Sequence, residues 1–266
     1  MICAQPTLLG PALLAHMQLR ASVSLMLRQF GQMDAELDDP AEDEEEVEGM
    51  RFGDALAALA LSEGRWIARG GEDRPMRPDL PSDFFAELVW TAAACLAAAA
   101  RRAAPERVNP LLTAFEQAAE SLLADHDERV SPLIAAEELV EQMGDLADAP
   151  DLLVAALSGR RFLLFAALAA RRQRLTIFQV IHILTMAPLP QLAALCRALG
   201  GSDADYRHLL LALRPVRPWL TDNVVITEAE RYQDVGQEAA NAAMSALRMP
   251  DSFRAKLDHL MGLIAA

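Results

Sequence analysis

The side chains that most often carry out chemistry are few and scattered in this chain. It has one lysine, Lys256, and five histidines: His16, His126, His182, His208 and His259. No two histidines are spaced i, i+4 on one expected helix, and none has a cysteine or carboxylate at metal-ligand spacing. The lysine follows no glycine-rich loop, and the sequence contains no GxGxxG, GxSxG, CxxC or HExxH motif. The sequence therefore predicts no catalytic residue, no metal site and no cofactor, and we expect a protein that is not an enzyme.

The sequence around one histidine is similar to a known phosphorylation motif. Residues 126–133 (HDERVSPL) place a histidine before an acidic residue, an arginine, a serine and a proline. This order is similar to the phosphoacceptor box of histidine kinases, but the proline comes one residue late and no ATP-binding domain follows. The end of one helix before His126 and the start of another at Pro132 explains the same residues. His126 is therefore a candidate phosphoacceptor only in the alternative that the protein is a signal-transduction component.

Two arginines occur where a helix is expected to begin. Arg160 and Arg161 come directly before the apolar segment Phe162–Ala170. Positive charge is unfavourable at a helix N-terminus, so these side chains need an anionic partner. An internal carboxylate, an acidic protein ligand and the chain's own acidic segment Asp34–Glu48 are the alternatives. Trp219, in a proline-flanked loop, is a lid over the core or an exposed anchor for a partner.

The composition predicts an all-α fold that positions these residues. Apolar residues make up 53% of the chain but aromatic residues only 5%, so the core must consist mainly of alanine and leucine. Both residues are strong helix formers. Expected helices of about ten to eighteen residues alternate with short breaks, a rhythm typical of a HEAT-like α-solenoid or an irregular orthogonal helical bundle. We expect about a dozen short helices.

The sequence divides into three parts. Residues 1–32 are predicted to form an amphipathic N-terminal helix that ends at Gly31. Residues 33–49 are predicted to form an acidic flexible linker, because Asp34–Glu48 contains ten carboxylates in fifteen residues. Residues 50–266 predict the helical-repeat domain, with a core over 80–215 and C-terminal helices over 226–266.

Helix faces and ends can be assigned at several places. One apolar face is expected on the helix after Ser82, formed by Phe85, Leu88, Val89, Ala92, Leu96 and Ala99. Phe162–Ala170 is apolar all round and predicts a helix buried between its neighbours. Ser202 with Asp205, and Thr227 with Glu230, have the spacing of capping boxes.

The overall charge limits the partners and the compartment. The formal net charge is −14, which disfavours nucleic acid as a partner. Three distant cysteines do not form a disulfide framework, and a reduced cytoplasm is expected. The longest apolar runs, Leu88–Ala100 and Phe162–Ala170, are too short to span a bilayer, so no membrane is expected as a partner. The oligomeric state is left open.

About half of the chain resembles a known family. The residues that carry the likeness lie in the segments 84–90 (FFAELVW), 121–128 (SLLADHDE), 150–157 (PDLLVAAL) and 159–168 (GRRFLLFAAL). Over residues 80–215 the chain resembles domain-of-unknown-function family 2336, which is found in alphaproteobacteria. The resemblance implies a HEAT-like helical fold and no activity, because the family has no established catalytic residues to carry over.

These observations favour a non-enzymatic module that binds another protein. A signal-transduction component is the first alternative, acting through His126 or through the acidic face of a phosphorylated partner. An enzyme with a site assembled only in space is the second alternative.

Overall fold

The structure is a computed structural model that describes residues 8–36, 53–67, 79–103, 105–250, 252–254, 256–257 and 260. The described residues are 82% helical and contain no strand, which confirms the all-α prediction and is consistent with a helical bundle or solenoid. The helices are α1 (Pro11–Glu36), α2 (Gly53–Ile67), α3 (Ser82–Ala103), α4 (Val108–Ala124), α5 (Pro132–Met143), α6 (Pro150–Ser158), α7 (Phe162–Gln173), α8 (Ile177–Thr185), α9 (Leu189–Ala198), α10 (Asp203–Ala212), α11 (Asp222–Tyr232) and α12 (Gln237–Leu247). Three short 3-10 helices join some of them: η4 (Pro105–Arg107), η5 (Glu128–Val130) and η6 (Gly144–Asp148).

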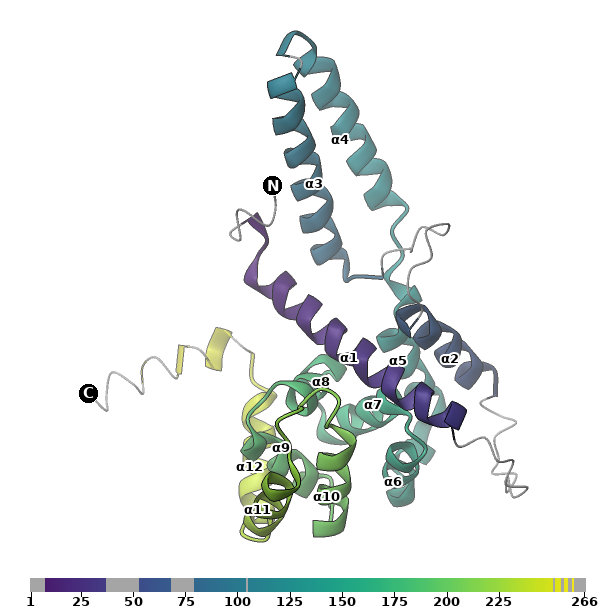
Figure 1. Ribbon diagram of the computed structural model, residues 1–266, viewed down its shortest axis with the longest axis vertical. Coiled ribbons are helices and arrows are strands. Elements are labelled where there is room, and N and C mark those ends of the chain that lie inside the picture. The colour runs from purple at the N-terminus through teal and green to yellow at the C-terminus, as the bar shows by residue number, and fades with distance from the viewer. Residues whose placement is uncertain are drawn as a thin grey trace.

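Helix α7 lies at the centre of the helical body. Every residue from Phe162 to Ala170 is buried, as the uniformly apolar sequence predicted. Helices α5, α6 and α8 pack directly against α7, while α9 to α12 complete the body around them (Figure 1). Alanines such as Ala166 and Ala169 allow the neighbouring helices to approach closely.

Helix α1 belongs to this body and ends later than predicted. Val23 and Met26 are completely buried in the main core, and the helix continues past Gly31 to Glu36. The acidic segment predicted as a linker is thus helical over Asp34–Glu36, and its remaining positions lie outside the described residues. Asp79 accepts hydrogen bonds from Arg20 of α1 and from the Trp66 indole of α2, which joins these two helices.

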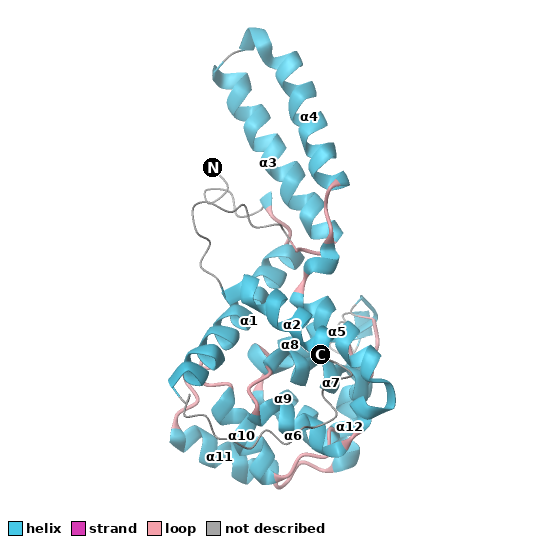
Figure 2. Cartoon of the chain, turned by 90° about the vertical axis from the view of Figure 1, so that its right-hand side faces the viewer, coloured by secondary structure: helices cyan, strands magenta, loops and turns pink. Residues whose placement is uncertain are grey.

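Helices α3 and α4 form a hairpin that projects away from the body (Figures 1 and 2). The two helices pack along each other, with Phe85, Val89 and Ala119 in a small core of their own. Their tip is η4, and the body lies at their other end, which we call the base of the hairpin. The rest of the described chain therefore leaves most of the hairpin surface uncovered.

The helix caps agree with the sequence at one predicted position and differ at another. Ser202 and Asp205 form the expected capping box at the start of α10. The capping box predicted at Thr227 is wrong, because α11 begins at Asp222 and Thr227 lies inside it. The helix starts earlier because Thr221, directly after the Pro218 turn, already has the extended backbone of an N-cap residue.

Candidate protein-interaction surface

Each helix of the hairpin has two apolar stripes. Only one stripe on each helix packs against the other helix. Phe85 and Val89 of α3 face Ala119 of α4. Leu88, Ala92, Cys95 and Ala99 form a second stripe on α3 at the 4-3-4 spacing of a heptad repeat. The single apolar face predicted for this helix is therefore two faces, because thirteen consecutive uncharged residues hide the boundary between them.

Helix α4 also has a second apolar stripe, with a 3-4-4 spacing. This stripe consists of Leu111, Ala114, Ala118 and Leu122. Leu122 is 56% exposed, and Leu88 of the α3 stripe is 36% exposed. Large apolar side chains exposed on both helices of the hairpin indicate a surface that a partner covers.

The two second stripes lie on the same side of the hairpin. On each helix the second stripe is about 90–110° from the stripe that faces the other helix, turned in the same sense about its own axis. Since the helices run antiparallel, equal rotations bring both stripes to one side. We call this side, formed by Leu88, Ala92, Cys95, Ala99, Leu111, Ala114, Ala118 and Leu122, the outer face.

On the opposite side of the hairpin α4 is polar, whereas α3 exposes Trp90, which is 43% exposed. This side carries Glu116 and Glu120 of α4 and Arg101 of α3, all exposed. Helix α4 is thus amphipathic, with an apolar outer stripe and a charged back. This asymmetry is typical of a helix that packs one side against another apolar surface.

His126 lies at the base of the hairpin, where it fixes the junction with the body. Its Nε2 donates a hydrogen bond to the Leu80 carbonyl oxygen at 2.7 Å, and its ring stacks on Phe85 at 4.0 Å between centroids. The Glu128 carboxylate accepts hydrogen bonds from Ser82 N and Oγ and thereby caps α3. These contacts give His126 a structural role, and phosphotransfer through it stays a prediction.

Arg160 and Arg161 lie at the junction of α6 and α7, as the sequence placed them. Arg160 adopts a left-handed backbone with φ 54°, a conformation in which a helix-ending glycine is usual. Arg161 is the exposed N-cap residue of α7, and its positive charge acts on Glu63 of α2. An internal carboxylate thus lies within electrostatic range of one of the two arginines. Binding of a protein partner by them stays a prediction.

Glu63 gives this junction a pH dependence. Burial raises the pKa of Glu63 to about 7, and the Arg161 charge partly opposes that rise. The folded protein therefore holds this proton more tightly than the unfolded chain, and stability is lost as pH rises from about 4.5 to about 7.

We expect Glu63→Gln to raise the free energy of unfolding by about 2 kcal/mol at pH 8 and to change it little below pH 4.5. Urea unfolding at the two pH values measures this difference. Glu138→Gln, at an exposed carboxylate of α5, is the control and should change neither value by more than about 0.5 kcal/mol. An equal effect of Glu63→Gln at both pH values would contradict the raised pKa.

Trp219 is half exposed, at 52%, and therefore does not act as a closed lid. Below it lies Arg217, whose guanidinium carbon is 5.9 Å from the indole centroid. Arg217 is 2% exposed and donates to the carbonyl oxygens of Ile183, Leu184 and Ala187, each at 2.8 Å. The prediction from the sequence did not include this buried arginine. Its position between Pro215 and Pro218 is the only sequence feature that could have suggested it.

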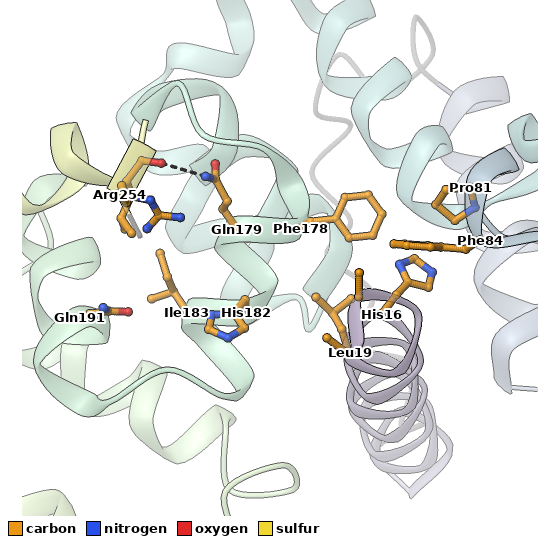
Figure 3. A pocket seen from close by; sticks show the side chains of 13 residues that line it. His16, Leu19, Pro81, Phe84, Phe178, Gln179, His182, Ile183, Gln191 and Arg254 are labelled. Atoms are coloured by element: carbon orange, nitrogen blue, oxygen red, sulfur yellow. Dashed lines mark hydrogen bonds between the residues drawn. The ribbon is translucent and has the colours of Figure 1, made fainter. Parts of the chain in front are cut away.

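A groove with a volume of about 670 Å³ opens between α1, the start of α3 and α8 (Figure 3). The His16 ring lies between Phe84 and Phe178, with centroid distances of 5.1 and 5.3 Å. Burial and the nearby Arg20 charge lower the pKa of His16, so it is neutral at pH 7. Across the groove, Gln179 donates to the Leu247 carbonyl oxygen at 2.8 Å. The groove is lined mainly by apolar side chains, and its polar lining residues are His16, Gln179, His182, Gln191 and Arg254.

Within the part of the chain that the structure describes, no three histidine, cysteine or acidic side chains are grouped so that they could hold a metal ion. Cys196 is near Asp205 and His208 around a smaller cavity, but burial raises the pKa of its thiol to about 11. A protonated thiol is a poor nucleophile at neutral pH.

Helix α3 is the one described helix that is long and apolar enough to cross a membrane. Its best window has a mean hydropathy of 1.4 and is 11% buried. The helix is longer than the apolar run in the sequence because it includes Asp83 and Arg101 at its ends. A single helix of this kind is weak evidence for a membrane span, and the observation is compatible with a soluble protein.

The comparisons with known proteins add no relative. No family model, no curated protein and no solved structure matches this chain. The resemblance to domain-of-unknown-function family 2336 is therefore neither supported nor refuted, and it stays a prediction.

Proposed function

We propose that this chain is a non-enzymatic protein-interaction module and that the outer face of the α3–α4 hairpin is its docking surface. One observation carries the proposal: two apolar stripes lie on the same side of a projecting hairpin, and their leucines Leu88 and Leu122 are 36% and 56% exposed. Exposing such a face costs solvation free energy that a partner would recover.

The net charge and the free thiols support the class of partner and the compartment that we propose. A net charge of −14 disfavours nucleic acid as the partner. Cys95 and Cys196 are free thiols, which suits the reduced cytoplasm that we propose as the compartment. Three residues at the surface of the body, away from the hairpin tip, are secondary candidates for binding the partner: Arg160, Arg161 and Trp219.

Photo-cross-linking of the full chain in its native cytoplasm tests the docking surface. A photoreactive residue in place of Ala118, on the outer face, should give a covalent protein adduct. The same residue in place of Glu120 is the matched control, since it lies two residues away on the polar back of the same helix. Adducts of equal yield from both positions, or none from position 118, would refute the proposal.

A further inference from the structure

We infer that the outer face of the α3–α4 hairpin binds a second copy of this chain, with the two hairpins packed antiparallel, tip to base, in a four-helix bundle. The inference rests on the proposed function, because it names the partner of the same surface. It commits the protein to a symmetric dimer with one isologous interface.

The size of the outer face matches what a stable dimer needs. Helices of 22 and 17 residues are about 33 and 25 Å long. Two adjacent helices present a face about 20 Å wide, so the projected area is roughly 500–650 Å² per copy. The accessible area of a ridged helical surface exceeds its projection, which brings the face near the ~800 Å² per partner of a standard interface.

The residue types of the outer face fit another copy of itself. Each stripe combines alanines with larger apolar side chains: Ala92 and Ala99 with Leu88 on α3, and Ala114 and Ala118 with Leu111 and Leu122 on α4. Small residues at heptad positions allow helices to approach to about 8–10 Å, and the leucines then fill the spaces between them. A two-fold axis presents the same pattern from the other side, so each leucine can lie against the alanines of the partner.

The charges at the two ends of the hairpin are of opposite sign. At the tip, the sequence from 101 to 107 contains three arginines and one glutamate. At the base, five carboxylates outnumber one arginine; the carboxylates belong to Asp83, Glu87, Asp125, Asp127 and Glu128. An antiparallel pair brings each basic tip to an acidic base, whereas a parallel pair would place six arginines together. The antiparallel pair also puts the two bodies at opposite ends, because each body lies at the base of its own hairpin (Figure 1).

A lipid surface fits the hairpin less well than a second copy does. Glu116 and Glu120 lie in the middle of α4, where a membrane-inserted hairpin would have to desolvate both carboxylates. The hairpin from 82 to 125 also carries six acidic residues against three arginines, so an anionic leaflet would repel it.

Sedimentation of the full chain tests the dimer. The mass should be close to twice the 29.0 kDa of the chain at protein concentrations of about 1 µM and above. Leu122→Glu and Ala118→Glu place a charge at exposed positions of the interface, so both variants should stay folded and sediment as monomers. Ile226→Glu is the matched control: Ile226 is 58% exposed on α11, close to the 56% of Leu122, and this variant should remain a dimer.

Reversal of one tip charge tests the antiparallel arrangement. The variant Arg102→Glu, at the tip end of the α3 outer stripe, should weaken the dimer at least about 5-fold, because each tip then repels the acidic base of the partner. A parallel pair would keep its affinity, since like charges meet at the tips before and after the reversal. An unchanged dissociation constant would therefore overturn the antiparallel arrangement.

Other outcomes separate this inference from the proposed function. A wild-type chain that is monomeric at about 100 µM overturns the second copy. If position 118 then still cross-links to a different protein, the outer face remains a docking surface and only the identity of the occupant is wrong. If it cross-links to nothing, both proposals fail. A monomer that floats with anionic lipid vesicles through the outer face would replace the second copy by a membrane.

Discussion

Replacing Arg217 with alanine should lower the free energy of unfolding by about 3–5 kcal/mol, which is enough to unfold much of a marginally stable domain. The Arg217 guanidinium is 2% exposed and donates to three carbonyl oxygens at 2.8 Å. Two of these, from Ile183 and Leu184, belong to the last turn of α8, and the third, from Ala187, lies two residues beyond its end. Without Arg217 these buried acceptors lose their donor and the helix end loses a favourable positive charge.

Urea unfolding followed by circular dichroism measures the loss. Arg217→Lys should recover only part of it, because an ammonium group cannot reach three fixed acceptors in the plane of a guanidinium. Arg214→Ala is the control three residues away: Arg214 is a surface residue paired with the exposed Asp222, so its loss should cost about 1 kcal/mol or less. A change of less than about 1 kcal/mol for Arg217→Ala would show that the three hydrogen bonds are not formed in solution.

The fold class and the central helix could be predicted from the sequence because they depend on local composition. Alanine and leucine at 3.6-residue spacing are sufficient to predict helices, and the uniformly apolar Phe162–Ala170 segment is sufficient to predict the buried α7. Helix boundaries were less predictable. Gly31 does not end α1, and Thr227 is interior to α11, because a helix end also depends on tertiary packing that the sequence pattern does not contain.

The outer face could not be recognised from the sequence, although its residues were noted. Leu88 and Val89 are both apolar, and the sequence alone does not show which of them faces α4. Only the position of α4 separates the inner stripe from the outer one. Arg217 was missed for a related reason: its three acceptors come from residues 30 to 34 positions earlier in the chain, and no local spacing indicates them.

Cys95 provides a native probe of the outer face. The thiol lies in the α3 stripe between Ala92 and Ala99 and is half-buried in a single copy of the chain. A second copy packed on the outer face would cover it. Of the other two cysteines, Cys196 is buried with a pKa raised to about 11 and should react slowly, and Cys3→Ser removes the third, which lies outside the described residues.

The rate at which Cys95 reacts with a maleimide, measured at increasing protein concentration, tests the docking surface most directly. For a dimer well above its dissociation constant, the free monomer fraction falls with the square root of concentration. The rate constant should therefore decrease about 10-fold between about 1 µM and about 100 µM, and Leu122→Glu should react fast at both. A rate that is fast and independent of concentration in the wild-type chain would show that no second copy covers the outer face. A slow rate that does not change on dilution or in Leu122→Glu would show that the chain itself covers Cys95, and would equally contradict the dimer.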